Sequence, residues 1–250
     1  NKAQAGLVLT AEYSDLWKED KKTETNEVMF ALQHSAKHKI ASNYGKSYYP
    51  SDYSPNAGWA DYYGNEDFFK AYPNDDRKEW NYMTEWKIKS GEIIPYTESA
   101  DKLPAISKYY DYDEGAPGKS AQSNGITCIY RYAEVLLMYA EASTRATNTV
   151  NQDALNAIQE VQKRAGYQDR QIELTTTTEP TAFLAAVSNE RGWEFFAEMK
   201  RWFELVRLEK VKEVRAEEWD ASTFNTNHHY YFPVPYQQVD LAGWTNNAGY

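Results

Sequence analysis

The 250-residue sequence contains a single cysteine, Cys128. An intrachain disulfide is therefore excluded, and with it the class of small secreted domains that disulfide bonds hold together. No apolar run approaches the roughly 20 residues that a membrane-spanning helix needs, and no basic-then-apolar signal sequence stands at the amino end. The chain begins Asn1-Lys2-Ala3 without methionine, so we expect a mature or truncated product.

Clusters of basic residues are also scarce. The chain has 27 Lys and Arg against 37 Asp and Glu, a net charge of −10, and its densest basic run is Lys37-His38-Lys39. A nucleic-acid partner is therefore not expected, because phosphate binding needs clustered Lys and Arg. Gly-rich phosphate loops and the Gly-x-Ser-x-Gly and His-Glu-x-x-His motifs are absent too.

The few arrangements that suggest metal or catalytic chemistry have simpler explanations. Asp111–Gly115 partly matches a calcium loop, but the position of the bidentate Glu holds Gln122. His34 and His38 are four residues apart, but His34 falls at the end of an expected strand and not on a helix. Cys128 has no local base and reads as a small buried residue. We expect no catalytic residue, no metal site and no cofactor.

The spacing of apolar residues in two segments of the second half predicts packed helices. Within the segment 131–142, Tyr132, Val135, Leu136 and Tyr139 fall at i, i+3, i+4 and i+7, which predicts one buried face. A second helix is expected from Asn151, its N-cap, to Ala165, before Gly166. The short polar link between the two helices favours an antiparallel hairpin.

A second helical pair is expected to open near Thr178 or Glu179, with Pro180 in the first turn. Its sequence interleaves acidic and basic residues at helical spacing. A nearby guanidinium lowers a carboxyl pKa, whereas a general acid needs a raised one. The pattern therefore predicts structural ion pairs among Glu190, Glu194, Glu198, Glu204, Arg191, Arg201 and Arg207.

Two stretches alternate with the period of a β-strand. The first runs from about Glu27 to Gln33, and the second from Tyr82 to Ile88, ended by Ser90-Gly91. We expect them to form a small sheet or a hairpin-like patch.

Residues 44–63 have the most unusual composition. They hold seven Tyr or Trp residues among Gly, Ser, Pro, Asp and Asn, without Val, Ile, Leu, Met or Phe. Such a stretch predicts a surface loop that displays amphipathic rings, and a ring face packs well against the apolar face of a sugar. The alternative is that the rings fold back onto the helices. The candidate ligand-binding residues are Trp59 first, then Tyr53, Tyr49, Tyr62 and Asn56.

Four stretches in the second half carry a resemblance to a known family. They are RYAEVLLMYAEA at 131–142, ALNAIQEVQKRAG at 154–166, ER-x2-E-x3-E-x2-RWFELVR at 190–207 and FPVPYQQVDLAGWTNNAGY at 232–250. In order and spacing the chain resembles the C-terminal half of SusD/RagB proteins, nutrient-binding outer-membrane lipoproteins of Bacteroidetes-type bacteria.

The sequence departs from the family pattern at three points. The family usually has a second Arg where Gly192 stands, Phe-Glu-Gly in place of 197–199, and Asn-Pro-Gly-Tyr in place of 247–250. Because glycine breaks helices easily, its absence at position 199 favours a continuous or bent helix there.

The resemblance implies one mainly α domain over 1–250, with tetratricopeptide-like helix pairs, long irregular loops and a few short β-strands. Its parts are a loop-rich part (1–125), helical hairpins (126–215) and an extended C-terminal segment (216–250). It also implies a non-catalytic protein of the outer-membrane cell surface, held by a lipid anchor upstream of this chain. Such a protein captures starch- or other polysaccharide-type oligosaccharides for a partner TonB-dependent transporter of the SusC type.

Two other classes of function stay open. A helical-repeat scaffold would grip a peptide or protein, with the loop aromatics as an interface hot spot. A glycoside hydrolase would need two free carboxyl groups about 5 to 10 Å apart, and Asp52, Asp61 and Glu66 are near the loop in sequence.

Overall fold

The computed structural model describes residues 6–54, 57–109, 123–214 and 229–250. The chain divides into two compact units, residues 1–198 and residues 199–250, and each is described by itself. The prediction of a single domain over 1–250 stays a prediction.

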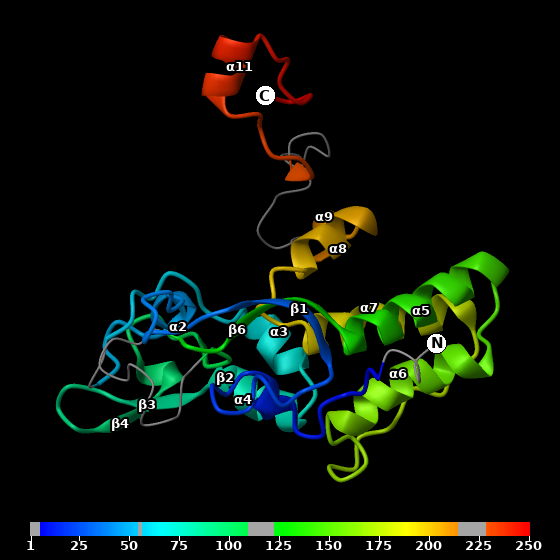
Figure 1. Ribbon diagram of the computed structural model, residues 1–250, viewed down its shortest axis with the longest axis horizontal. Helices are drawn as coiled ribbons and strands as arrows, with labels where there is room; N and C mark the ends of the chain where they lie inside the picture. The colour runs from blue at the N-terminus through cyan, green and yellow to red at the C-terminus, as the bar shows by residue number, and fades with distance from the viewer. Residues whose placement is uncertain (1–5, 55–56, 110–122, 215–228) are drawn as a thin grey trace. The chain divides into compact units, whose positions relative to one another are not determined.

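Three helices pack together in the first unit (Figure 1). Helix α5 (Tyr132–Thr147) packs against both α6 (Gln152–Arg164) and α7 (Pro180–Glu194). The expected caps are present: the Asn151 side chain accepts a hydrogen bond from the backbone N–H of Ala154 at 2.7 Å, and Glu179 caps α7, whose first residue is Pro180. Local sequence signals thus place the starts of α6 and α7 correctly.

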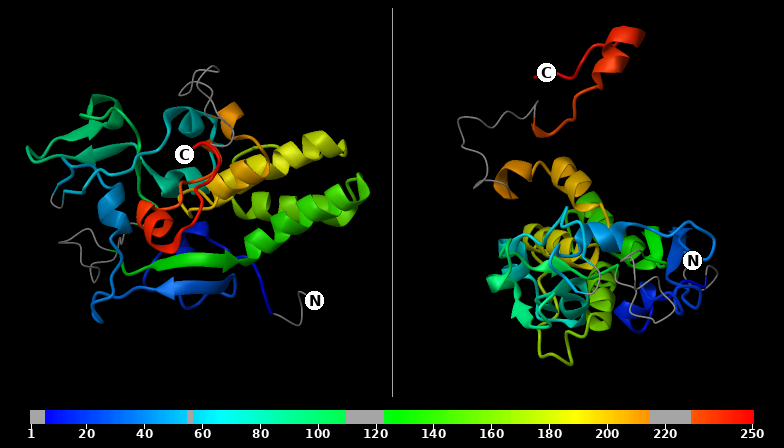
Figure 2. Two further views of the ribbon diagram at one scale, coloured as in Figure 1. Left: turned by 90° about the horizontal axis from the view of Figure 1, so that it is seen from above. Right: turned by 90° about the vertical axis from the view of Figure 1, so that its left-hand side faces the viewer.

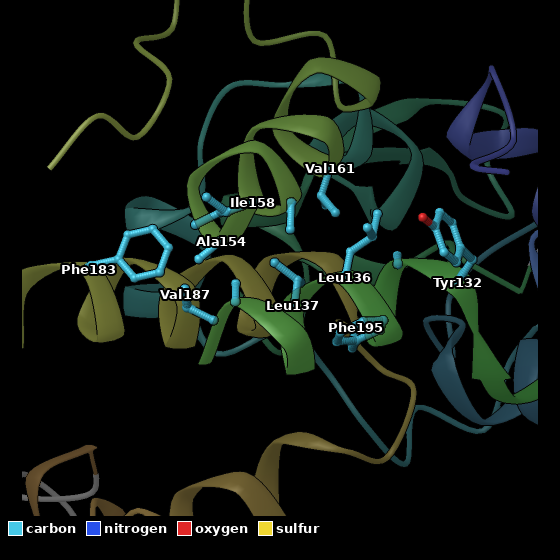
Figure 3. Close-up of a cluster of buried hydrophobic side chains, with 12 residues drawn as sticks. Tyr132, Leu136, Leu137, Ala154, Ile158, Val161, Phe183, Val187 and Phe195 are labelled. Carbon is cyan, nitrogen blue, oxygen red and sulfur yellow. The ribbon is translucent and has the colours of Figure 1, made fainter. Parts of the chain in front are cut away.

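The predicted buried face of α5 is wrong in part. Tyr132 and Leu136 are buried, but Val135 and Tyr139 are 41% and 44% exposed. Because α5 contacts two helices, its buried face is not centred on the residues that the spacing predicts. It includes Ala133, Leu137 and Ala140, each 0% exposed. In Figure 3 the side chains of Leu136 and Leu137 meet those of α6 and α7, namely Ala154, Ile158, Val161, Phe183 and Val187.

The strands form ribbons of two. Strand β1 (Val28–Gln33) is confirmed, but it pairs antiparallel with β6 (Ile126–Arg131), which leads directly into α5. The expected strand at 82–88 is divided into β2 (Tyr82–Met83), paired with β5 (Ala105–Ile106), and β3 (Glu85–Lys87), paired with β4 (Ile93–Pro95). The prediction that both stretches share one sheet or hairpin is therefore wrong.

The partner changes at Thr84, between β2 and β3. Its carbonyl accepts a hydrogen bond from the backbone N–H of Tyr96 at 2.8 Å. Figure 1 places α5, α6 and α7 at one end of this unit and the β3–β4 ribbon at the other, and the left view of Figure 2 shows the same arrangement of the ribbon and α5. The remaining elements of the unit are η1 (Tyr13–Leu16), α2 (Tyr44–Tyr48), α3 (Glu66–Ala71), α4 (Asp76–Asn81) and η2 (Tyr96–Glu98).

A second core connects the strands to the loop region. It includes Trp17, Tyr48, Tyr109 and Ile126, together with Cys128, which is 4% exposed as expected of a small buried residue. Tyr48 of α2 belongs to this core, and Tyr44 packs against it, so the core holds α2 in place beside the candidate site.

The second unit contains α8 (Arg201–Arg207), α9 (Val211–Val214) and α11 (Tyr236–Ala242). The expectation of a continuous or bent helix through position 199 is wrong, because α7 ends at Glu194 and α8 begins at Arg201. Ala197 and Met199 adopt positive φ values of 58° and 60°. Non-glycine residues thus make the left-handed turns here, at some conformational cost.

Candidate functional site

The stretch 44–63, predicted as a loop, begins with the short helix α2, and its described residues after α2 form an irregular loop that is hydrogen-bonded to α2 through the backbone. The carbonyls of α2 and of the two residues after it accept the loop's N–H groups, which places the loop alongside the short helix. The bonds run from Trp59 to Lys46 at 2.7 Å, from Asp61 to Ser47 at 2.9 Å, from Ala60 to Tyr49 at 3.0 Å and from Gly58 to Pro50 at 2.9 Å. Satisfied backbone groups give an irregular loop a fixed position.

The close approach requires glycine at position 58. A Cβ atom on Gly58 would lie 2.0 Å from the carbonyl oxygen of Tyr49 and 2.3 Å from its Cβ. These are backbone and near-backbone atoms, so no side-chain rotation relieves the clash. The loop can follow this path only because Gly58 lacks a side chain.

The five candidate residues have different positions. Trp59 and Tyr62 are 51% and 62% exposed, so their rings are open to solvent. Tyr53 is half-buried and pairs with Ile88 of the hairpin region. Tyr49 is 1% exposed and packs edge-on against Tyr53, with ring centroids 4.9 Å apart. Asn56 lies outside the described residues.

Burial removes Tyr49 from the surface that a ligand would touch. Its ring and carbonyl support the loop instead, since Ala60 donates to that carbonyl. The interpretation that the rings fold back thus holds for Tyr49, whereas Trp59 and Tyr62 are displayed. Whether these residues bind a ligand stays a prediction.

Lys46 is a candidate site residue that the sequence interpretation did not identify. Its ammonium nitrogen lies 4.9 Å from the centroid of the Trp59 ring, which is a cation–π arrangement. The Lys46 carbonyl also accepts the Trp59 N–H. The only sequence signal was a lysine inside the aromatic stretch, and its contact with a residue 13 positions away depends on the loop's path.

Neighbouring rings support Tyr62 from the core side. Tyr62 lies against Tyr48, with ring centroids 5.8 Å apart, and Tyr48 stacks on Tyr109 at 5.9 Å. Burial raises the pKa of Tyr48 to about 12, and the neighbouring Tyr44 and Tyr62 add to this rise. Tyr48 therefore stays a neutral phenol at physiological pH.

Two of the three carboxylates named as candidates for a hydrolase have structural partners. The Asp52 carboxylate accepts a hydrogen bond from the indole N–H of Trp86 at 2.7 Å. Glu66 pairs with Lys70 at 3.0 Å, one helical turn away on α3. These contacts give Asp52 and Glu66 structural partners, while Asp61 is exposed on the loop.

The predicted ion-pair network exists, but most of its partners come from other elements. Arg77 of α4 bonds to Glu190 at 2.6 Å and to Glu194 at 2.8 Å. Arg131, at the end of β6, contacts Glu194 and bonds to Glu198 at 2.8 Å. Further members are Asp75, Glu27, Arg164 and Lys108, and all these charged side chains are at most 3% exposed.

Of the arginines predicted as partners, Arg201 pairs with one of the predicted glutamates, and Arg191 contacts a glutamate of another helix. Arg191 lies 3.4 Å from Glu134 of α5, and Arg201 pairs with Glu204 at 3.1 Å within α8. The interpretation of the glutamates as structural is supported, and pairing with an interleaved arginine is confirmed for Arg201 and Glu204. A buried carboxylate needs a buried cation, and no spacing rule reveals a partner from a distant segment.

The electrostatics of this network favour the charged form of Glu194 at its centre. Burial alone would raise the pKa of Glu194, but the guanidinium groups of Arg164, Arg131 and Arg77 together hold it below its usual range. Burial lowers the pKa of Lys108 to about 8 against the opposing effect of Glu198. Lys108 therefore remains protonated at pH 7, where it bonds to Glu198 at 2.7 Å.

No cluster of three or more His, Cys, Asp or Glu side chains suited to a metal ion occurs among the described residues. His34 contacts the Thr127 hydroxyl at 2.7 Å through its Nε2 atom. The calcium-like stretch Asp111–Gly115 and its Gln122 lie outside the described residues. In the part of the chain that the structure describes, no helix is long and apolar enough to span a membrane.

Packed helix pairs joined by long loops and short ribbons define a mainly α protein, as predicted. The model of the SusD family matches residues 83–250. The chain therefore belongs to the SusD family.

Two curated proteins of Formosa agariphila are similar. SusD-like protein P2 is 26% identical over 274 residues, which cover 100% of this chain and 54% of that protein. SusD-like protein P25 is 27% identical over 144 residues, 56% of this chain and 26% of that protein. The chain thus spans about half the length of the first of these relatives.

Solved structures share the fold. A SusD homolog from Bacteroides thetaiotaomicron has a TM-score of 0.77 and 20% identity, covering 98% of this chain and 56% of the other. The surface glycan-binding protein A of the same species, in complex with laminarihexaose, has a TM-score of 0.71 and 22% identity, covering 96% and 56%.

Proposed function

We propose that this protein binds glycans at the bacterial cell surface, without chemical turnover, through the loop at 44–63. The observation that carries the proposal is the display of two open rings, Trp59 and Tyr62, on a loop whose backbone is fixed to α2. Rings held in place before binding contribute stacking area at little entropic cost.

Family membership supports the same function. The chain belongs to the SusD family, and a protein of the same fold was solved with laminarihexaose. We extend this to a starch- or other polysaccharide-type ligand, to a position on the outer membrane through an upstream lipid anchor, and to delivery of oligosaccharides to a SusC-type TonB-dependent transporter. These finer points follow the resemblance of the sequence motifs.

Tryptophan fluorescence tests the proposal, because Trp59 is both probe and candidate contact. The protein is titrated with a panel of oligosaccharides, and affinities are measured by calorimetry. We expect a saturable signal, and Trp59→Ala should weaken binding by roughly 1–3 kcal/mol, the range of an interface aromatic.

The matched control is Trp244→Ala, which removes a similarly exposed indole, 58% exposed, from the other unit. It should leave the affinity unchanged. The absence of any glycan response in the full-length protein would contradict the proposal. Release of reducing sugar, lost on changing Asp52, Asp61 or Glu66, would instead favour the hydrolase.

One observation favours the scaffold as a second candidate. The outer face of α5 exposes Val135, Met138 and Tyr139 at 41%, 53% and 44%, whereas the exposed residues of α6 are mostly polar. An apolar stripe on a helix commonly faces another protein surface. Transporter binding that persists without the 44–63 loop, in a protein with no glycan affinity, would support the scaffold.

A further inference from the structure

The Lys46–Trp59 pair combines a stacking ring with a positive charge at one place. The ammonium of Lys46 lies 4.9 Å from the ring centroid of Trp59. No carboxylate of a described residue forms an ion pair with Lys46, in contrast to Lys18, Lys21, Lys70 and Lys108. Its charge is therefore balanced only by the ring and by solvent within the described part of the chain.

The pair is built into the backbone. The Lys46 carbonyl accepts the Trp59 N–H at 2.7 Å, and Gly58 makes that approach possible. The ammonium and the ring thus belong to two residues whose backbones are hydrogen-bonded to each other. This arrangement distinguishes Lys46 from a lysine that merely extends into solvent, since its side chain begins beside the Trp59 ring.

We propose that this site takes glycans that carry an anionic group, a uronic-acid carboxylate or a sulfate ester, in preference to neutral glycans. The inference rests on the proposed function and names the ligand class of the same loop. The sugar stacks on Trp59 and Tyr62, and the Lys46 ammonium bonds to the anionic substituent.

A competition at the ring explains the preference. A neutral sugar that occupies the face of Trp59 displaces the ammonium and loses the cation–π contact. An anionic sugar displaces it too, but offers it a charge-assisted hydrogen bond in exchange. The same lysine therefore works against neutral ligands and in favour of anionic ones.

The surrounding negative charges limit the attraction between Lys46 and an anionic glycan to short range. The chain carries a net charge of −10, so its overall field repels an anion. Of the nearby carboxylates, Asp52 accepts the Trp86 N–H, whereas Asp61 is exposed on the loop. The preference must therefore come from direct contact with Lys46, which sets the design of the test.

The experiment compares three hexasaccharides by calorimetry on the full-length protein: laminarihexaose (neutral), an oligogalacturonate (carboxylate) and a carrageenan oligosaccharide (sulfate). We expect at least one anionic ligand to bind more tightly than the neutral one. Lys46→Met should weaken that anionic ligand by about threefold to tenfold, the scale of an exposed charge pair, while Lys46→Arg retains it.

Salt separates a charge contact from a structural role. Affinity for the anionic ligand should fall between 50 mM and 500 mM NaCl in the wild type, and this dependence should flatten in Lys46→Met. Lys163→Met is the matched control, since it removes an exposed lysine from α6, a helix outside the 44–63 stretch. This control should change the affinity for neither the neutral nor the anionic ligands.

Each outcome has a defined meaning. The inference is overturned if the neutral hexasaccharide binds as tightly as both anionic ones, or if Lys46→Met weakens neutral and anionic ligands equally. The relative strengths of the carboxylate and sulfate ligands identify which anionic group is preferred. Failure of these three ligands and of the whole oligosaccharide panel to bind would contradict the proposed function itself, which separates the two failures.

Discussion

A single glycine controls how the aromatic loop reaches α2. An added Cβ at Gly58 would meet the Tyr49 carbonyl oxygen at 2.0 Å, so Gly58→Ala must push the loop away from the helix. We expect this substitution to cost about 1–3 kcal/mol of unfolding free energy, the usual range of overpacking. Urea denaturation of the variant measures the cost.

The loop's display of Trp59 should change in the same variant, with a shift of the tryptophan emission maximum. Ala57→Ser, at an exposed position one residue earlier, is the control and should leave both readings as in the wild type. An unchanged denaturation midpoint in Gly58→Ala would show that the loop is not held against α2 in solution.

At this scale, composition was enough to predict the displayed rings but not which of them is buried. Tyr49 and Trp59 occur in the same type of sequence, yet one is 1% and the other 51% exposed. The difference follows from the loop's path over α2, which depends on hydrogen bonds between residues eight or more positions apart, such as Trp59 to Lys46. No local pattern encodes these bonds.

At the scale of elements, the cap of α7 gives a pH-dependent prediction. The Glu179 carboxylate accepts hydrogen bonds from the N–H groups of Ala182 at 2.6 Å and Thr181 at 3.0 Å. These bonds lower the pKa of Glu179. A carboxyl group with a depressed folded-state pKa contributes stability above its unfolded-state pKa, and this contribution is lost as the pH falls through the folded-state value.

Glu179→Ala should therefore lower the Tm at pH 7 by more than it does at pH 3, because protonation already weakens the wild-type cap at low pH. Thermal unfolding followed by circular dichroism at both pH values checks this. Glu173→Ala removes the same charge from an exposed position outside the helices and should show no such difference. Equal Tm losses at pH 7 and pH 3 would rule out a role for the ionised cap.

The starts of helices were predictable because their signals are local, whereas the pairing of elements was not. Asn151, Glu179 and Pro180 act within one turn of the chain, and each was placed correctly. Strand β1 was also expected, but its partner β6 begins more than 90 residues later. The period of α5 likewise could not distinguish its two apolar faces, because the choice depends on where α6 and α7 dock.

At the scale of the whole first unit, buried charges link segments that lie far apart in sequence. Arg131 bonds to Glu27 at 2.8 Å, ahead of β1, and to Glu198 at 2.8 Å, after α7. Arg164 of α6 contacts the same Glu27 at 2.9 Å. The glutamates were expected to be structural, but the arginines that neutralise them are 60 or more residues away in most cases, for example Arg131 and Glu194.

Arg131→Met tests this network. Removing the guanidinium leaves Glu27, Glu194 and Glu198 buried with fewer counterions, and an uncompensated buried charge costs about 3–5 kcal/mol of unfolding free energy. Arg145→Met is the matched control, because Arg145 pairs with Glu141 at 2.7 Å but is 49% exposed. An exposed pair of this kind contributes only about 0.3–0.5 kcal/mol.

A double-mutant cycle shows whether the charges act as one unit. Arg131 and Arg164 both contact Glu27 and Glu194, so the effects of Arg131→Met and Arg164→Met should be non-additive by about 0.5–3 kcal/mol. Guanidinium unfolding of the two single variants and the double variant gives this coupling. Additive effects, or an Arg131→Met variant as stable as Arg145→Met, would mean that the buried network does not hold these segments together, and that the apolar cores of α5–α7 and of the strands suffice.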